Sequence, residues 1–405
     1  MKQVKIVGLG LGSKEFLTPC ALSALENAEE VFITDTLEKR LEFSFKNVIH
    51  TSLSEIAEKV INSSAKNIVI PVSGDVNFFS LSQMLEPKLS LCGDICLEFI
   101  NGISSMQYFF AKLKLRYDDV KIISAHGRKI EISAVVSYNR KVFSLTGGDN
   151  NASYICKKLF EKGLGYVKVS IGENLGLESE KIYSGTASDF VDTSISSLAV
   201  MFIENINAVN PDIMFKDEDF ERAKVPMTKE EIRWLSVSKL QIQPKDIVYD
   251  IGAGTGSVTL EMAKKARESL VYAVEQKAEA VALIEKNIEN LGCHNIELVQ
   301  AKAPDVMELW EAPDKVFVGG SSGNLGDILM CIINKAKMAK KPFKLVINTV
   351  TIETLTESTQ VLNKLDFEDV EYVNVSSAKS QKMGAYNLMI AANPVYIISA
   401  QYNAV

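Results

Sequence analysis

The chain has 405 residues, of which 47% are hydrophobic, and a formal net charge of −7. This length predicts two or three domains with substantial buried cores. The acidic balance argues against nucleic acid as the principal partner, because phosphate binding normally leaves a basic footprint. The N-terminus, MKQVKIVGLG, has no signal-peptide pattern, and no window approaches about 18 uninterrupted apolar residues. We therefore expect a cytoplasmic protein without a membrane segment.

The cysteines and histidines argue against a metal site. Six cysteines lie scattered at positions 20, 92, 96, 156, 293 and 331, as is typical of reduced thiols rather than of a disulfide framework. Cys92 and Cys96 have the wrong spacing for a zinc knuckle and no matching second pair. With only three histidines in the chain, no metal centre is predicted.

The first half of the chain alternates short β-branched runs with helical patterns, as in VKIVGLG, EVFITD, NIVIPVSG and KVFSLTGG. This alternation predicts a mostly parallel sheet covered by helices. The first helix has a readable start, because Thr18 can cap it and Pro19 suits its first turn. Glycines gather at the carboxyl ends of several predicted strands, which is the edge where open α/β sheets usually bind ligands.

A polar, acidic stretch without sustained periodicity follows Glu204 and predicts a linker over residues 208–224. It separates an N-terminal domain, 1–207, from a C-terminal domain, 225–405. The second domain again alternates helices and strands, beginning with TKEEIRWLSVSKLQI, IVYDIG, SVTLEMAKKA and LVYAVE. The repetition is one of architecture and not of sequence.

The motif DIGAGTGSVTLE predicts a ligand loop between a strand and a helix. Gly252, Gly254 and Gly256 let the backbone turn tightly and approach a ligand with no Cβ in the way. A dinucleotide fingerprint needs its third glycine where this chain has Ser257. Glu275 ends the next strand, where its carboxylate can accept both ribose hydroxyl hydrogens. Together these features favour S-adenosylmethionine, the alternative being a tight turn without a ligand.

Two interpretations remain open for the segment before this loop. Thr228 and Glu231 have capping-box spacing, so helix-start chemistry explains both residues at least as well as a ligand role does. The two roles can coexist at one site.

The C-terminal motifs PMTKEEIRWLSVSKL, DIGAGTGSVTLE, VYAVE, VFVGGSSGNL, INTVTIETL and GAYNLMIAANPVYII together resemble the decarboxylating cobalt-precorrin C15-methyltransferases of cobalamin biosynthesis. The N-terminal motifs VGLGLGSKEFLTPCAL, PVSGDVNFF, INGISSMQYFFAKL, SAHGR and SIGENLG resemble the tetrapyrrole methylases, in particular their C5-methyltransferase branch. In this order the two halves are similar to fused, bifunctional C5,C15-methyltransferases. The resemblance implies an α/β chain in which a two-lobed tetrapyrrole methylase fold precedes a class I Rossmann-like methyltransferase domain.

The resemblance also implies two binding sites for S-adenosylmethionine. The loop 319–324 follows the strand end where the substrate should approach. Departures from the family pattern are Lys277 and Lys302, where acidic residues are common, Leu11 in place of proline, and residues 76–77 in place of PG. The predicted cofactor residues are Thr228, Asp250, Gly252, Gly254, Thr255, Gly256, Glu275 and Ala303 in the C-terminal domain, and Ser73, Gly74, Asp75, Ser104 and Ser105 in the N-terminal domain.

A sulfonium methyl is already activated, so the enzyme mainly aligns a carbon nucleophile with it and excludes water. The resemblance implies that the nucleophiles are C5 and C15 of a precorrin or cobalt-precorrin, and that the ring C acetate is decarboxylated at the C-terminal site. It further suggests a homo-oligomer through the C-terminal domain. An alternative is that the N-terminal half is a catalytically silent corrinoid-binding module. Another is a methyltransferase for a different small molecule or RNA.

A tetrapyrrole with many carboxylates needs local basic residues on this acidic chain. Arg128 is a natural clamp, because a guanidinium makes bidentate contacts with a carboxylate. Lys129, Lys379 and Lys382 are further candidates, although the segment SAKSQKMG around the last two also suits a solvated loop. His126 either touches a ligand or is a structural hydrogen-bonding residue.

Overall fold

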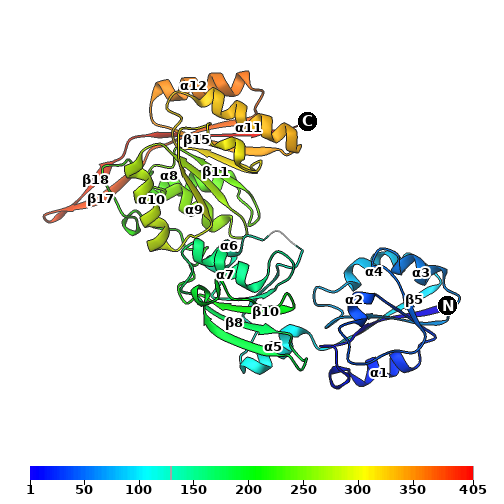
Figure 1. Ribbon diagram of the computed structural model, residues 1–405. Coiled ribbons are helices and arrows are strands. Elements are labelled where there is room, and N and C mark those ends of the chain that lie inside the picture. Colours follow the sequence, from blue (N-terminus) through cyan, green and yellow to red (C-terminus); the bar gives the residue numbers. More distant parts are fainter. Residues whose placement is uncertain (128–129, 405) are drawn as a thin grey trace. The chain divides into compact units, whose positions relative to one another are not determined.

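The computed structural model describes residues 1–127 and 130–404. The chain is divided into two compact units, which Figure 1 colours along the sequence. Within the described residues, no helix is long and apolar enough to cross a membrane. The first unit consists of Met1–Arg128, Lys141–Cys156 and Lys168–Ile203, and the second of Lys129–Arg140, Lys157–Val167 and Glu204–Val405.

The first sheet of the first unit is entirely parallel, as the alternating sequence pattern predicts. Its strand order is β3-β2-β4-β1-β5. Strand β1 contributes to two cores, because Val4 and Ile6 pack on one face and Val7 packs on the other. The strands are β1 (Lys2–Gly8), β2 (Glu30–Ile33), β3 (Val48–His50), β4 (Asn67–Val72) and β5 (Ile95–Ile100), and the helices are α1 (Pro19–Glu26), α2 (Asp35–Glu38), α3 (Ile56–Asn62) and α4 (Ser82–Leu89).

The start of α1 confirms the predicted cap. The Thr18 hydroxyl accepts a hydrogen bond from the Ala21 amide at 3.2 Å, and Pro19 is the first helical residue. Such a cap satisfies one of the amides that a helix leaves unpaired in its first turn.

The second sheet of the first unit is mixed, with the order β6-β7-β10-β8-β9. Strands β6 and β7 are parallel, whereas β8 and β9 are antiparallel. The connection between β8 and β9 is only seven residues, 174–180, which is too short for the crossover that a parallel pair needs. The elements are α5 (Ser105–Leu113), β6 (Lys121–Ser124), α6 (Ile132–Tyr138), β7 (Lys141–Leu145), α7 (Ala152–Glu161), β8 (Lys168–Glu173), β9 (Lys181–Thr186) and β10 (Ala199–Glu204).

The second unit contains a seven-stranded sheet of order β13-β12-β11-β14-β15-β19-β16. The first five strands in this order are parallel, and β19 is antiparallel to both of its neighbours. The elements are α8 (Glu230–Leu240), β11 (Val248–Ile251), α9 (Ser257–Lys265), β12 (Val271–Glu275), α10 (Ala278–Leu291), β13 (Ile296–Gln300), β14 (Lys315–Val318), α11 (Leu325–Ala339), β15 (Phe343–Thr349), α12 (Ile352–Lys364), β16 (Glu368–Val375), β17 (Ala378–Met383), β18 (Tyr386–Ala391) and β19 (Val395–Tyr402).

Helices cover both faces of this sheet. Tyr249 and Ile251 of β11 pack with α11, whereas Val248 packs with α9 on the opposite face. The strand order reverses at β11, which lies between β12 and β14, and such a reversal opens a crevice at the carboxyl ends of the strands. The ligand loop after β11 therefore lies at the edge of the sheet where binding is expected.

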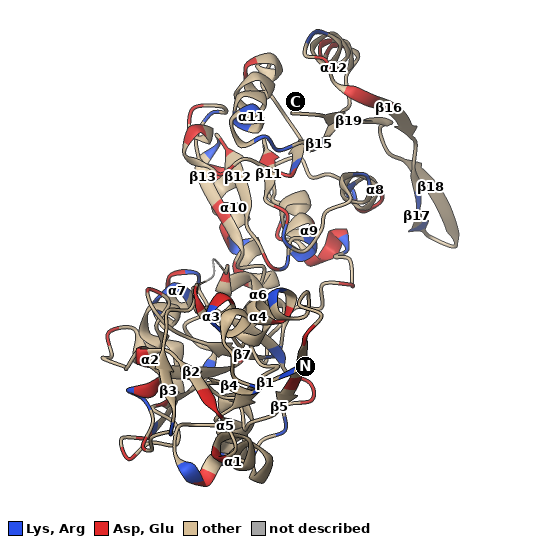
Figure 2. Ribbon diagram, turned by 90° about the vertical axis from the view of Figure 1, so that its right-hand side faces the viewer, with Lys and Arg blue, Asp and Glu red and all other residues tan. Residues whose placement is uncertain are grey.

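The acidic stretch 208–224 is part of the second unit and packs on its core. Phe220 is buried in its core, Phe215 packs beside it, and the two rings make an edge-to-face contact. Charged side chains hold this stretch as well, since Arg233 of α8 donates to an Asp217 carboxylate oxygen at 3.1 Å. Figure 2 shows basic and acidic residues interspersed along the ribbon of both units.

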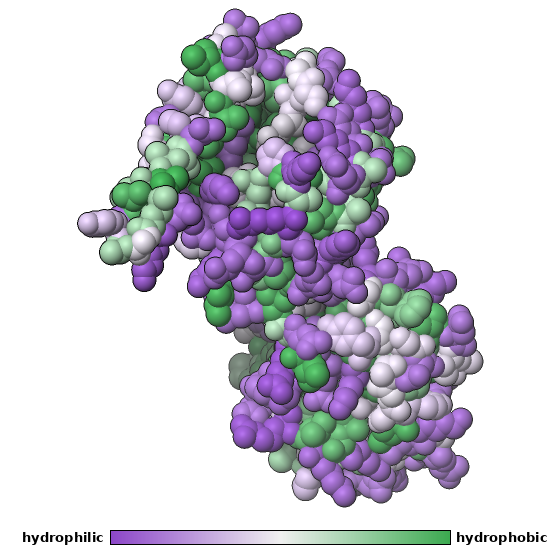
Figure 3. Space-filling view, turned by 90° about the vertical axis from the view of Figure 1, so that its left-hand side faces the viewer, coloured by the Kyte–Doolittle hydropathy of each residue, from purple (hydrophilic) through white to green (hydrophobic). Residues whose placement is uncertain are grey.

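Of the two interpretations of the segment around Lys379 and Lys382, the solvated loop is right about exposure and wrong about the loop, because the segment is a strand. These residues lie on β17, which pairs in antiparallel register with β18 to form a two-stranded arm. Every residue of both strands is exposed. The arm carries apolar side chains in solvent, including Tyr386 and Met389, and Figure 3 shows this hydrophobic surface on the projecting arm.

Candidate functional site

A cavity of about 280 Å³ lies at the carboxyl ends of β11, β12 and β14. It brings together residues that are far apart in the sequence and that the glycine pattern singled out. Its lining includes Gly252 and Gly254, the ribose candidate Glu275, residues 301–303, and the glycine-serine loop 319–322. Val225 and Pro226, from the segment before α8, form a further wall.

The glycines of the first loop are required by its backbone. Gly252, Gly254 and Gly256 have φ of 73°, 60° and 77°, a region that residues with a Cβ rarely adopt. A Cβ on Gly252 would lie 2.4 Å from the Gly320 carbonyl oxygen, so two glycine loops are packed directly against each other. This close packing shapes the floor of the cavity.

Glu275 is fixed at the cavity wall by backbone donors. One carboxylate oxygen accepts from the Gly254 amide at 3.0 Å, and the other accepts from the Lys277 amide at 2.9 Å. Each carboxylate oxygen has a second lone pair, so both retain acceptor capacity toward a ligand. The side chain is 8% exposed and lines the cavity, which leaves its carboxylate both oriented and reachable.

Asp250 lies beneath the loop and is not among the residues that line the cavity. Its carboxylate is fully buried and accepts a hydrogen bond from the Thr259 hydroxyl of α9. Its other oxygen has no hydrogen-bond partner among the described residues. Burial raises the pKa of Asp250 to about 7, with a smaller contribution from the Glu275 charge.

Three other predicted cofactor residues, Thr228, Thr255 and Gly256, do not line this cavity. Thr255 is buried, and its carbonyl accepts from the Asn287 amide group at 3.0 Å. Gly256 precedes the first residue of α9. The Thr228 carbonyl accepts from the Arg233 guanidinium at 2.9 Å, which ties the segment before α8 to that helix.

The capping box predicted at Thr228 and Glu231 is wrong. Helix α8 begins at Glu230, so Lys229 occupies the capping position and makes no side-chain cap. Lys379 of β17 instead pairs with Glu230 at 2.7 Å and with Glu231 at 3.0 Å. The ion pair with Lys379 thus engages the Glu231 carboxylate that the capping box would need.

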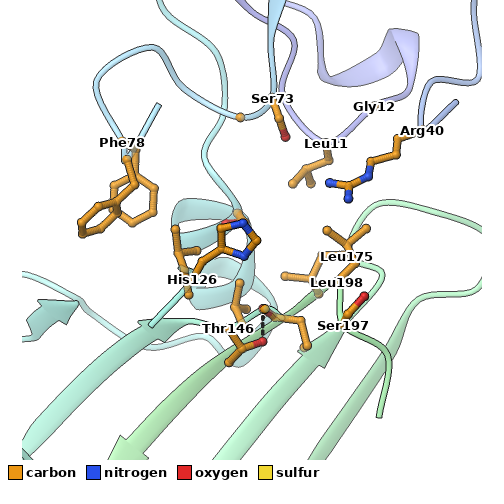
Figure 4. A pocket seen from close by; sticks show the side chains of 18 of the residues that line it. Leu11, Gly12, Arg40, Ser73, Phe78, His126, Thr146, Leu175, Ser197 and Leu198 are labelled. Carbon is orange, nitrogen blue, oxygen red and sulfur yellow. Dashed lines mark hydrogen bonds between the residues drawn. The ribbon is translucent and has the colours of Figure 1, made fainter. Parts of the chain in front are cut away.

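A second cavity, of about 400 Å³, lies in the first unit and is shown in Figure 4. Residues from both of that unit's sheets line it. Its lining includes four residues of the predicted cofactor motifs, Ser73, Gly74, Asp75 and Ser105. The first glycine loop, 9–12, also lines it. His126 also lines this cavity and packs against Gly147, where a Cβ would lie 2.0 Å from its ring.

The first glycine loop serves close packing at the ends of three neighbouring strands. Gly10 and Gly74 exchange two backbone hydrogen bonds, of 3.1 and 2.9 Å. A Cβ on Gly102 would lie 2.3 Å from the Gly74 carbonyl oxygen, and one on Gly8 would meet the Gly102 amide at 2.6 Å. Glycine at these positions lets the loops meet at the base of the cavity.

Two predicted residues of this half have backbone partners. Ser104 caps α5 and forms a capping box with Gln107, and it does not line the cavity. The Asp75 carboxylate accepts from the Gly102 amide at 3.2 Å and from the Asn77 amide at 2.9 Å. Asp75 is therefore turned toward the backbone of its own loops.

The predicted carboxylate clamps that the structure describes, Lys379 and Lys382, do not line either of these two cavities. Arg128 and Lys129 lie outside the described residues. Lys379 pairs instead with two glutamates. Sequence reasoning missed Arg40, which does line the cavity of the first unit, because EKRLEF gives no signal beyond an ordinary charged surface. Within residues 1–127 and 130–404, no group of three or more His, Cys, Asp or Glu side chains could hold a metal ion.

Comparisons with known proteins match both halves of the chain. The family described as "Precorrin methyltransferase domain" matches residues 218–402, and that described as "Tetrapyrrole (Corrin/Porphyrin) Methylases" matches residues 3–191. The chain belongs to the precorrin methyltransferases, and it joins a tetrapyrrole methylase domain to a precorrin methyltransferase domain.

Two curated relatives match the C-terminal half. A probable cobalt-precorrin-6B C(15)-methyltransferase (decarboxylating) of Pyrobaculum calidifontis is 38% identical over 187 residues, which are 45% of this chain and 93% of the relative. One of the same description from Saccharolobus solfataricus is 35% identical over 197 residues, 47% of this chain and 94% of the relative. The crystal structure of precorrin-6y C5,15-methyltransferase from Geobacter metallireducens is 34% identical and covers 47% of this chain and 97% of its own, with a TM-score of 0.44.

Proposed function

We propose that the chain is an S-adenosylmethionine-dependent enzyme of cobalamin biosynthesis that methylates a precorrin or cobalt-precorrin at C5 and C15 and decarboxylates the ring C acetate. The observation that carries the proposal is the cavity after β11, where a glycine loop faces the oriented carboxylate of Glu275. Residues 1–207 would form the two-lobed C5 domain and residues 225–405 a class I Rossmann-like C15 domain, joined by 208–224.

The cavity of the second unit fits an adenosine ligand. Gly252 and Gly254 offer bare backbone, and Glu275, which accepts from the Gly254 amide, keeps free lone pairs for ribose hydroxyls. Residues 301–303 line the cavity where an adenine ring would lie. The family commonly has an acidic side chain there, and this chain has Lys302, so backbone groups of 301–303 would contact the adenine instead. S-adenosylmethionine, when bound, supplies a methyl group that needs no further activation.

The chemical work left to the protein is alignment and exclusion of water. The loop 319–322 lines the cavity next to the loop that carries Gly252, and we take it as the surface toward which a macrocycle carbon would be presented. No nucleophilic side chain is required, because the electrons for the new bond come from the reduced ring. Those released by decarboxylation return to the same ring.

Mass spectrometry with an isotopically labelled methyl donor tests the proposal. After incubation with a purified precorrin intermediate, the full chain should yield a product with two labelled methyl groups that has lost one carbon dioxide. Glu275→Gln should abolish or strongly slow the C15 methylation and decarboxylation and leave C5 methylation intact. A wild-type product with only the C15 changes would mean that the N-terminal half is a silent binding module, and an unaltered substrate would refute the proposal.

We also propose that the chain forms a homo-oligomer through the β17–β18 arm. Its exposed side chains include Tyr386, 75% exposed, and Met389, 65% exposed, on a strand pair with solvent on both faces. A contiguous apolar surface of this kind marks an interaction site. In sedimentation velocity, a variant with serine at both positions should have a smaller mass than the wild type. Leu309→Ser, which removes an even more exposed apolar side chain outside the arm, should not.

A further inference from the structure

Arg40 projects a positive charge into the cavity of the first unit. It follows the short helix α2, and Figure 4 shows its guanidinium beside Leu11, on the side where Leu175 and Leu198 lie. Among the described residues that line this cavity, it is the only lysine or arginine. The only carboxylate in that lining, Asp75, is engaged by backbone amides of its own loops. The charge of Arg40 is therefore available to a ligand.

The backbone around Arg40 is held in place. Thr34 caps α2 by accepting from the Leu37 amide at 3.3 Å, and the Arg40 amide donates to the Leu37 carbonyl at 3.0 Å. The Glu42 amide donates to the Gly12 carbonyl at 3.1 Å. A Cβ on Gly12 would lie 2.9 Å from the Arg40 carbonyl oxygen, so the chain at Arg40 is pressed against the first glycine loop. A guanidinium on a fixed backbone loses less freedom when it binds a ligand.

Leucine side chains line the cavity beside this charge. Figure 4 shows Leu11, Leu175 and Leu198 around the same space as the guanidinium. An ion pair formed against apolar walls is screened less than one in open water. The combination of a leucine surface with one cation matches a flat, largely apolar ring that bears carboxylates at its rim. The leucines of the lining are Leu9, Leu11, Leu37, Leu41, Leu145, Leu175, Leu177 and Leu198.

We propose that Arg40 anchors a peripheral carboxylate of the tetrapyrrole in the cavity of the first unit. The proposal rests on the proposed function and assigns to Arg40 the clamp role at that site. A carboxylate also occurs on the methionyl end of S-adenosylmethionine, so the shared chemistry is a guanidinium–carboxylate pair. The leucine surroundings favour the macrocycle as its source.

Steady-state kinetics of the full chain separate the two sources. Arg40→Ala should raise the KM for the tetrapyrrole in C5 methylation about 10- to 100-fold, as expected for the loss of a charge-assisted hydrogen bond. The KM for S-adenosylmethionine and the C15 reaction, which takes place in the other unit, should stay unchanged. Arg40→Lys should recover part of the loss, because lysine keeps the charge but not the bidentate geometry. Lys39→Ala removes the adjacent exposed charge outside the cavity lining and should behave like the wild type.

Two results would overturn the anchor. One is an unchanged tetrapyrrole KM in Arg40→Ala, and the other is a rise confined to the KM for S-adenosylmethionine. If the wild type performs no C5 methylation, the proposed function fails for that half, and a calorimetric titration with the same tetrapyrrole decides the anchor separately. Weakened binding at one class of site in Arg40→Ala then supports the anchor, and an unchanged isotherm contradicts it.

Discussion

Replacing Gly252 with alanine tests the packing of the two glycine loops that form the floor of the second unit's cavity. The new Cβ would lie 2.4 Å from the Gly320 carbonyl oxygen and 2.9 Å from the Gly320 amide nitrogen. Both are backbone atoms, which cannot move aside as a flexible side chain can. Gly252 also has φ of 73°, which alanine adopts only with strain.

The expected loss is the sum of these two effects. Left-handed backbone costs a non-glycine residue roughly 1–2 kcal/mol. Overpacking a tight site costs about 1–3 kcal/mol. Gly252→Ala should therefore lower the free energy of unfolding by roughly 2–5 kcal/mol, a large part of the 5–15 kcal/mol that is typical of a native protein.

Urea denaturation followed by tryptophan fluorescence measures this loss. Both tryptophans of the chain, Trp234 and Trp310, lie in the second unit, so the signal reports that unit alone. Gly320→Ala is the matched control on the facing loop, because its φ is not positive and its Cβ would meet no atom within 4 Å. It should leave stability unchanged or raise it by up to about 1 kcal/mol. A Gly252→Ala protein as stable as Gly320→Ala would refute the close approach of the two loops.

Two buried charges give further predictions. Burial raises the pKa of Asp250 from 3.8 to about 7, so the folded chain holds this proton more tightly than the unfolded chain does. The contribution of Asp250 to the free energy of unfolding is therefore complete below about pH 4 and is lost as the pH rises to about 7. Asp250→Asn should remove this fall, on the order of 4 kcal/mol, from the unfolding free energies measured across that range, and an unaltered pH profile would contradict the burial argument. Arg233 is fully buried against Asp217 and Glu261, so Arg233→Met should cost about 3–5 kcal/mol in the same denaturation assay. Replacing the exposed Arg222 with alanine should lower the free energy of unfolding by less than about 0.5 kcal/mol. Equal losses in the two variants would show that the buried Arg233 cluster contributes no more to stability than an exposed arginine does.

Local backbone chemistry was readable from the sequence. The Thr18 cap depends on neighbouring residues only, and the structure confirms it. The positive φ of Gly252, Gly254 and Gly256 follows from the tight turn that their spacing predicts, and Glu275 faces Gly254 because adjacent parallel strands end at the same edge. These are features that a short stretch of chain decides by itself.

Contacts between distant segments were not readable in the same way. The pairing of Lys379 with Glu230 and Glu231 joins residues about 150 positions apart and displaces the helix cap that their local spacing predicted. Arg40 belongs to a stretch of mixed charges, and only its contact with the Gly12 loop turns it into a cavity residue. A sequence pattern records neither contact, because both depend on how separate loops meet.

The hairpin arm shows the same limit in another form. Strand β17 has the sequence AKSQKM, whose polar residues do not have the alternation of a half-buried strand. Its partner β18 supplies the hydrogen bonds, so pairing and not burial makes it a strand. The alternating hydrophobic pattern that predicts half-buried strands cannot predict a strand that is exposed on both faces.

The most direct test of two separate methyl-donor sites is a calorimetric titration of the full chain with S-adenosylmethionine. If each unit has its own methyl-donor site, the wild type should bind two molecules of S-adenosylmethionine per chain. Glu275→Gln should bind one, at the site of the first unit. A single binding event in the wild type, or two undiminished events in Glu275→Gln, would contradict this prediction.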